Sequence, residues 1–164
     1  MLVDSHCHLD FEDFNEDRDA VLARAAESGV GALQTICTRL SQFSQVLAIA
    51  EAHPHIWCSV GIHPHHVAKE DDFSTTDLLH IAELHKKVIG IGETGLDYFY
   101  DTSPRKKQVE AFRKHIDASR ESGLPLIVHT RSADRETCEI LREEAGKGAF
   151  SGVIHCFSVG REVA

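Results

Sequence analysis

Apolar residues along the chain alternate between two patterns. Short runs rich in Val, Ile and Leu predict buried strands. The chain opens with apolar residues at 2–3, and the runs follow at 31–37, 56–60, 88–92, 125–128 and 152–154. Between these runs, apolar residues spaced three and four apart predict amphipathic helices that begin near Asn15, Ser41, Ser74, Ser103 and Asp134. Strands that alternate with helices in this way favour an α/β fold with a parallel sheet covered on both faces.

Glycine, proline and serine predict where several of these helices begin and end. Gly29 should end the first helix, and Pro54 lies just beyond the second. We expect Ser103 to cap a helix whose first residue is Pro104, and we expect that helix to continue to Gly123.

Histidines and one glutamate lie at the carboxyl ends of the predicted strands. In parallel α/β folds that edge of the sheet holds the active site. His6 and His8 are two residues apart, so in a strand their side chains would project from the same face. The strand-end residues are His6, His8, His63, Glu93, His129 and His155.

Five of these residues are of the types that bind divalent cations. A closed barrel would bring them around one pocket, where a carboxylate can bridge two ions and imidazoles can fill the outer positions. Two such ions would activate a water molecule for hydrolysis, and Mg²⁺, Mn²⁺ and Zn²⁺ are the candidates. The structural alternatives are hydrogen-bonded histidines at strand ends and a Glu93 that caps a helix. The five residues are His6, His8, Glu93, His129 and His155.

Composition restricts the class of protein. With 164 residues and 42% hydrophobic content, we expect one soluble domain over 1–164. The opening has neither a basic start nor a long apolar run, which predicts no signal peptide or membrane span and a cytoplasmic location, or a nuclear one in a eukaryote. The five scattered cysteines should be free thiols. The net charge of −9 argues against a broad basic surface for nucleic acid, although bound cations could still supply positive charge to a nuclease pocket.

Five motifs resemble those of the TatD-type metal-dependent deoxyribonucleases, within the amidohydrolase-like superfamily. They occur in the family's order from end to end of the chain, at Asp4–Asp10, Gly61–His65, Ile91–Tyr98, Pro125–Arg131 and His155–Ser158. The resemblance implies a TIM-type (β/α)8 barrel, of which the first six strands and about five helices are present here. It also implies that the five candidate ligands bind metal, with Glu93 bridging two ions.

The resemblance further implies hydrolysis of DNA phosphodiester bonds, often from a 3′ end. The expected partner is therefore DNA, either single-stranded or at its 3′ ends. We expect His63 and Arg131 to contact the substrate, although Arg131 could instead pair with Asp97 or Asp134. Asp4 and Asp97 should orient neighbouring groups. We expect His65 to be structural or exposed, and His66 and His115 to lie on solvated faces. The alternatives are hydrolysis of another ester or amide, such as an aminoacyl-tRNA ester, and a catalytically impaired truncated isoform.

The chain departs from the family in two respects. Strands seven and eight are missing, together with the metal-binding aspartate of a Thr-Asp-Ala/Ser-Pro-like motif, and Val159 stands where the family usually has glycine. An incomplete barrel would leave its first and sixth strands as open edges. We therefore expect weak folding and lowered activity, unless self-association covers the gap.

Overall fold

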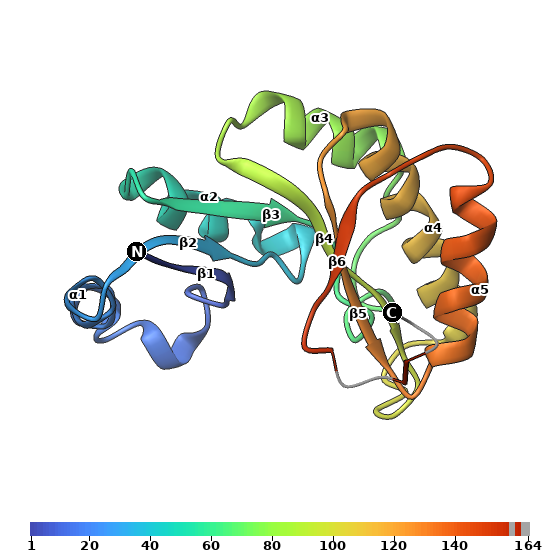
Figure 1. The fold of residues 1–164 in the computed structure, drawn as a ribbon, viewed down its shortest axis with the longest axis horizontal. Coiled ribbons are helices and arrows are strands. Elements are labelled where there is room, and N and C mark those ends of the chain that lie inside the picture. The colour runs from blue at the N-terminus through green and yellow to red at the C-terminus, as the bar shows by residue number, and fades with distance from the viewer. Residues whose placement is uncertain (158–159, 162–164) are drawn as a thin grey trace.

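Six parallel strands form a single sheet in the order in which they occur along the chain. In the computed structural model, which describes residues 1–157 and 160–161, the sheet curls into a half-barrel with the helices on its outer side (Figure 1). This arrangement confirms the predicted partial TIM-type barrel. The strands are β1 (Leu2–Cys7), β2 (Val30–Thr35), β3 (Ile56–Val60), β4 (Val88–Asp97), β5 (Leu126–Arg131) and β6 (Gly152–Ile154).

Five α-helices connect the strands, with short 3-10 helices at Glu12–Phe14 and Leu40–Gln42. They are α1 (Arg18–Glu27), α2 (Phe43–Ala52), α3 (Thr75–Leu84), α4 (Arg105–Ser122) and α5 (Asp134–Ala145). Ser74 caps α3 in a reciprocal pair with Asp77, as its position before the helix suggests. Gly123 ends α4 with φ 73°, a left-handed conformation that favours glycine. The predicted cap of α4 is wrong, because the Ser103 hydroxyl instead accepts a hydrogen bond from the Ala68 backbone N–H.

Helix α4 packs its apolar stripe against the sheet. Phe112 and Ile116 are fully buried, and so is His115, which we had expected on a solvated face. Nε2 of His115 accepts a hydrogen bond from the backbone N–H of Ile62 at 3.0 Å, and Nδ1 lies 2.7 Å from the Ala111 carbonyl oxygen. Burial lowers the pKa of His115 to about 4. The imidazole is therefore a neutral core group that ties α4 to the segment after β3.

Strand β4 is longer than its apolar run predicts. It continues past Glu93 to Asp97, because residues 94–97 pair with Val128–Arg131 of β5. The register shifts between Gly92 and Thr94, and the Gly92–Glu93 peptide bond is cis. A Cβ atom on Gly95 would collide with the carbonyl oxygen of His129, so the two strands approach closely at this glycine. Glu93 and His129 therefore project from within paired strands, whereas the sequence placed them just after strand ends.

Strands β1 and β6 are each paired on one side only, which confirms the expected open edges. Leu2, Val3 and Val153 on these strands are 61%, 62% and 57% exposed. The described residues form no disulfide, which agrees with the prediction of thiols for the cysteines. None of the described helices combines the length and the apolar character needed to cross a membrane. Ser158 and Val159, at the end of the last family motif, lie outside the described residues.

Candidate metal centre

Histidines from three segments converge on the buried carboxylate of Glu93. The residue is 2% exposed, and its backbone N–H donates a hydrogen bond to the Cys37 carbonyl at 3.2 Å. His6 in β1 places Nε2 3.3 Å from Oε2 of Glu93, and His129 in β5 places Nδ1 3.4 Å from Oε1. His63, after β3, has Nε2 4.0 Å from Oε1. Both oxygens of this carboxylate therefore face imidazole nitrogens.

Three groups of side chains have ligand atoms within 4.8 Å of one another, close enough to share an ion. They are His6, His8 and Glu93; His63, Glu93 and His129; and His65, Asp97 and His129. Among the described residues, Nδ1 of His8 is buried without a hydrogen-bond partner, and Nε2 of His6 lies close to Oε2 of Glu93 without making a hydrogen bond. A buried polar atom left unpaired is unfavourable, so a ligand at this position would stabilise it. Imidazole and carboxylate donors in this arrangement fit a borderline divalent cation.

The electrostatics of the centre also suit metal coordination. Burial by itself would raise the pKa of Glu93, but the imidazoles of His129 and His6 hold it well below its ordinary value. Burial lowers the pKa of His63 to about 3 and also lowers the pKa of His8. A charged carboxylate and neutral imidazoles are the protonation states that bind cations. Burial would lower the pKa of His129 as well, but its contacts with Glu93 and Asp97 raise it.

Asp97 lies at the end of β4 and is completely buried. Its Oδ2 is 3.0 Å from Nε2 of His129 and 2.7 Å from Nε2 of His65. Its Oδ1 accepts hydrogen bonds from the backbone N–H groups of Phe99 and Tyr100 at 3.1 and 2.9 Å. Asp97 therefore holds the His129 ring on the side opposite Glu93. The contact of His65 with Asp97 was not predicted from the sequence, although the two-residue spacing of His63 and His65 was a signal for it.

The other predicted site residues lie around this cluster. His155 follows β6 and stacks on His6, with ring centroids 3.3 Å apart, but it belongs to none of the three groups found among the described residues. Asp4 accepts a hydrogen bond from the backbone N–H of His6 at 3.1 Å. The exposed Arg131 places its guanidinium over the rings of Phe99 and Tyr100, 4.2 and 4.7 Å from their centroids.

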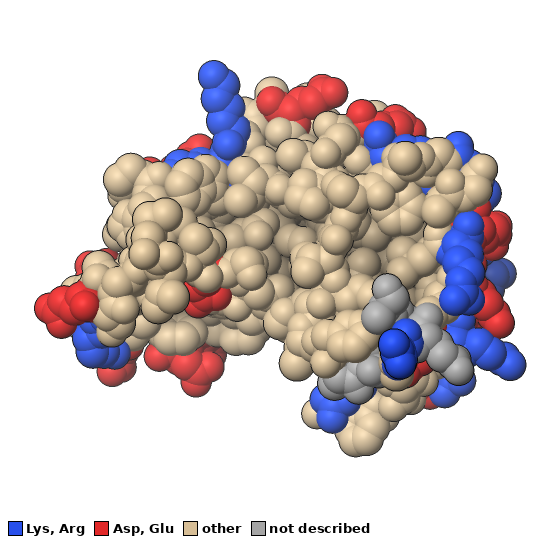
Figure 2. Space-filling model, viewed as in Figure 1, with Lys and Arg blue, Asp and Glu red and all other residues tan. Residues whose placement is uncertain are grey.

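Charged side chains elsewhere form no broad basic band on the face seen in Figure 2. Basic and acidic side chains lie around the rim of that face, and its middle is mostly uncharged. This distribution agrees with the net charge of −9. Arg131 does not form either of the ion pairs considered for it, with Asp97 or Asp134, among the described residues.

Comparison with known proteins gives consistent relatives over nearly the whole chain. The family model described as "TatD related DNase" matches residues 3–164. The "Uncharacterized metal-dependent hydrolase YcfH" of Escherichia coli (strain K12) is 39% identical over 167 residues, covering 100% of this chain and 62% of the relative. The "3'-5' ssDNA/RNA exonuclease TatD" of Erwinia tasmaniensis is 32% identical over 158 residues, covering 96% of this chain and 60% of the relative.

A solved structure agrees with these sequence relatives. The crystal structure of YJJV, a TatD homologue from Escherichia coli K12, superposes with a TM-score of 0.87 at 32% identity, covering 97% of this chain and 61% of that one. The chain thus spans less than two thirds of the length of these relatives. Because the family model and the relatives match along nearly all of it, the chain belongs to the TatD family of metal-dependent hydrolases.

Proposed function

We propose that the chain carries the metal centre of a divalent-metal-dependent deoxyribonuclease that removes nucleotides from the 3′ end of single-stranded DNA. The observation that carries the proposal is Glu93, which belongs to two of the three candidate ligand groups and faces imidazoles with both carboxylate oxygens. A carboxylate placed between two sets of histidines is suited to bridge a pair of ions. The name of the Erwinia relative, an ssDNA/RNA exonuclease, supports the substrate class.

In this proposal, His6 and His8 would hold one divalent cation together with Glu93, and His129 and His155 would hold a second one with the same carboxylate. Bound there, the ions would lower the pKa of the attacking water and stabilise charge on the phosphate. Glu93 stays ionised because the surrounding imidazoles depress its pKa. His63, kept neutral by burial, is positioned beside the carboxylate to offer a hydrogen bond to a phosphate oxygen.

Asp97 supports the centre through the orientation of His129. Its carboxylate accepts from Nε2 of the ring, which directs Nδ1 towards Glu93. A carboxylate behind a ligand histidine fixes both its tautomer and its ring plane. We propose that Asp4 has a comparable effect on β1, because it fixes the backbone at His6.

The proposal is tested with single-stranded DNA labelled at its 5′ end. Removal of nucleotides from the 3′ end in the presence of Mg²⁺ or Mn²⁺ should produce a ladder of progressively shorter labelled strands. Glu93→Gln should reduce the rate by about a hundredfold or more, because it removes the shared anionic ligand. Glu83→Gln, the same change at an exposed position of α3, is the matched control and should leave the rate unchanged.

A panel of other substrates separates the remaining outcomes. RNA, an aminoacyl-tRNA ester and simple carboxylic esters are offered to the same preparation, and metal content is measured alongside. Turnover of an ester without cleavage of DNA would contradict the proposed substrate. Bound metal with no turnover of any member of the panel would contradict hydrolysis by this chain.

A further inference from the structure

A polar cavity of about 610 Å³ adjoins the metal-ligand cluster. Its walls come from the segments that follow β1, β2 and β3. Phe11 in this wall stacks on His8, with ring centroids 4.6 Å apart and ring planes at 15°. The carbonyl of Thr38, also in the wall, accepts a hydrogen bond from the backbone N–H of His63 at 3.0 Å. The cavity and the candidate metal centre therefore share a boundary.

Three residues that line the cavity carry buried polar atoms without hydrogen-bond partners. Five buried side-chain nitrogen or oxygen atoms of the described residues have no hydrogen-bond partner, and two of them belong to His6 and His8 of the metal centre. The other three, Oδ1 of Asp10, Nε of Arg39 and Nδ1 of His66, belong to residues that line this cavity. Most buried polar groups in proteins are paired, so the three residues that line this cavity are unusual in each keeping an unpaired atom beneath its surface.

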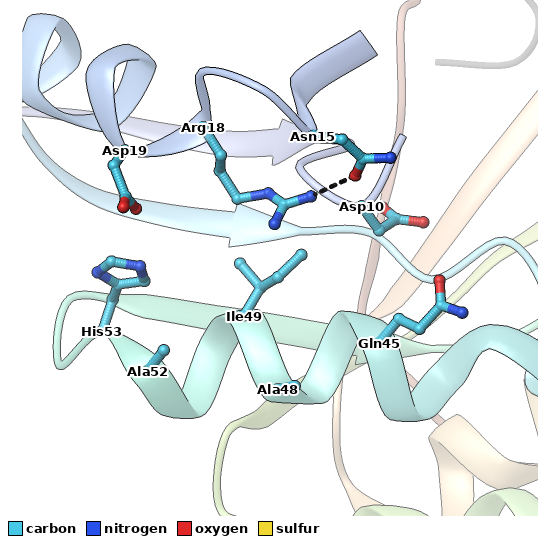
Figure 3. A pocket seen from close by; sticks show the side chains of 9 residues that line it. All are labelled: Asp10, Asn15, Arg18, Asp19, Gln45, Ala48, Ile49, Ala52 and His53. Atoms are coloured by element: carbon cyan, nitrogen blue, oxygen red, sulfur yellow. Dashed lines mark hydrogen bonds between the residues drawn. The ribbon is translucent and has the colours of Figure 1, made fainter. Parts of the chain in front are cut away.

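A neighbouring cavity contains an arginine whose side chain is hydrogen-bonded within the protein. It has a volume of about 430 Å³ and lies between α1 and α2, where Arg18 and Asn15 point towards each other (Figure 3). Arg18 makes two hydrogen bonds there, because Nε donates to the Leu9 carbonyl at 2.7 Å and Nη2 donates to Oδ1 of Asn15 at 3.1 Å. Its guanidinium holds the segment after β1 in place. The guanidinium of Arg39, in contrast, still has a donor to offer.

The charges around the larger cavity select the chemistry of its ligand. Its lining includes three carboxylates, Asp10, Glu12 and Asp13, and one guanidinium, Arg39. This excess of negative charge disfavours a phosphate group. A nucleobase is uncharged and presents both donors and acceptors along its edge, which arginine and carboxylate side chains can pair. Phe11 is 43% exposed and supplies an aromatic surface, and bases stack on such surfaces in single-stranded nucleic acid complexes.

We propose that this cavity binds one unpaired nucleobase of single-stranded DNA beside the metal centre. Phe11 stacks on the base, the guanidinium of Arg39 donates to its edge, and Asp10 accepts from it. The volume lies within the range of about 300 to 1,000 Å³ that is typical of small-ligand sites. The inference rests on the proposed function, because it takes single-stranded DNA as the substrate.

Binding is measured apart from cleavage, by fluorescence anisotropy of a 5′-fluorescein-labelled single strand in the presence of a chelator. Phe11→Ala and Arg39→Met should each weaken binding by about tenfold, the size expected for one stacked or paired base. Arg24→Met is the matched control, because Arg24 is an exposed arginine near the end of α1 that pairs with Asp17. It should change the dissociation constant by less than about twofold, as expected for an exposed charge. Circular dichroism confirms that each variant is folded.

A series of DNA strands, each with a single abasic position, identifies which nucleotide of the bound DNA places its base in the cavity. As the abasic position is moved along the strand, the wild-type chain should lose affinity at one position. Phe11→Ala and Arg39→Met should each show a smaller loss there than the wild-type chain, because one of the two contacts with the base is already missing. Free deoxyguanosine or deoxycytidine should compete with the strand, and inorganic phosphate should not.

The outcomes distinguish this inference from the proposed function. Equal affinity for intact and abasic strands at every position, or variants that bind like the Arg24 control, would overturn the base site and leave the nuclease proposal standing. Competition by inorganic phosphate alone would show an anion site instead and would also overturn it. A wild-type chain that binds no single-stranded DNA in the presence of the chelator would overturn the base site, whereas the nuclease proposal is judged by the cleavage assay with Mg²⁺ or Mn²⁺.

Discussion

Replacement of Asp97 by asparagine tests how a side chain that contacts a candidate ligand, His129, controls the metal centre. The carboxylate accepts four contacts, two at Oδ1 from the backbone N–H groups of Phe99 and Tyr100 and two at Oδ2 from the rings of His65 and His129. Asparagine has one oxygen and one NH₂ group. If the oxygen keeps the two backbone donors, the NH₂ group faces Nε2 of His129. The neutral ring must then accept at Nε2 and carry its proton on Nδ1, the nitrogen that faces Glu93.

The expected loss of metal affinity follows from this tautomer. With Nδ1 protonated, His129 has no lone pair to offer beside Glu93, so we expect metal affinity to fall by about 10- to 100-fold, or about 1.4 to 2.7 kcal/mol. The loss of hydrogen bonds to a buried charged group should also lower the free energy of unfolding by about 2 to 3 kcal/mol. Metal binding must therefore be measured well below the melting temperature of the variant.

Equilibrium dialysis against Mn²⁺, with metal content read by mass spectrometry, gives the affinity. Nitrogen-15 NMR of the histidine rings in the metal-free chain reports the tautomer, which a purely structural loss would not change. Asp101→Asn is the control, because Asp101 is exposed and its carboxylate pairs with Arg105, away from the metal centre. An Asp97→Asn variant that binds Mn²⁺ like the wild type, with its proton still on Nε2 of His129, would refute the reasoning.

Three further predictions concern the fold. Phe112→Ala should lower the free energy of unfolding by about 3 to 5 kcal/mol in urea titrations, because it opens a cavity in the core, and a loss below about 1 kcal/mol would contradict the packing described. Because the pKa of His115 is lowered to about 4, the unfolded chain binds a proton that the folded chain excludes, so stability should fall as the pH drops from about 6.5 to 4. His115→Gln should flatten that dependence in urea titrations at several pH values, and an unchanged slope would refute it. Val153→Lys on the open edge of β6 should reduce self-association in sedimentation velocity experiments, whereas a dilute wild-type monomer that melts cooperatively at high temperature would show that the edge needs no cover.

Local patterns were sufficient for most of the architecture. The start of α5 was predicted near Asp134, and Ser74 and Gly123 marked the start of α3 and the end of α4. These features depend on residues within a few positions of each other, so the sequence contains them directly. The sequential strand order was implied by the resemblance to a (β/α)8 barrel, in which each helix connects neighbouring parallel strands.

The features that were missed depend on partners far along the chain. The second half of β4 contains Thr94, Gly95 and Asp97, which do not form an apolar run, and only pairing with β5 makes it a strand. His115 is buried because the distant Ile62 N–H needs an acceptor. The Ser103 hydroxyl is likewise engaged across the fold, by the backbone N–H of Ala68. Sequence spacing cannot show which of several histidines or serines meets such a partner.

The sequential order of the six strands has a consequence for how the protein forms. Each strand pairs with its immediate predecessor, so every pairing closes a connection that contains one α-helix. Each of these closures is shorter than pairing with a more distant strand would require, so each carries a smaller entropy loss. During synthesis, a nascent chain can add its strands one by one as they leave the ribosome, since no strand waits for a distant partner. β6 has three residues and one neighbour, so its amide hydrogens should exchange with solvent before those of β3 and β4, which have neighbours on both sides.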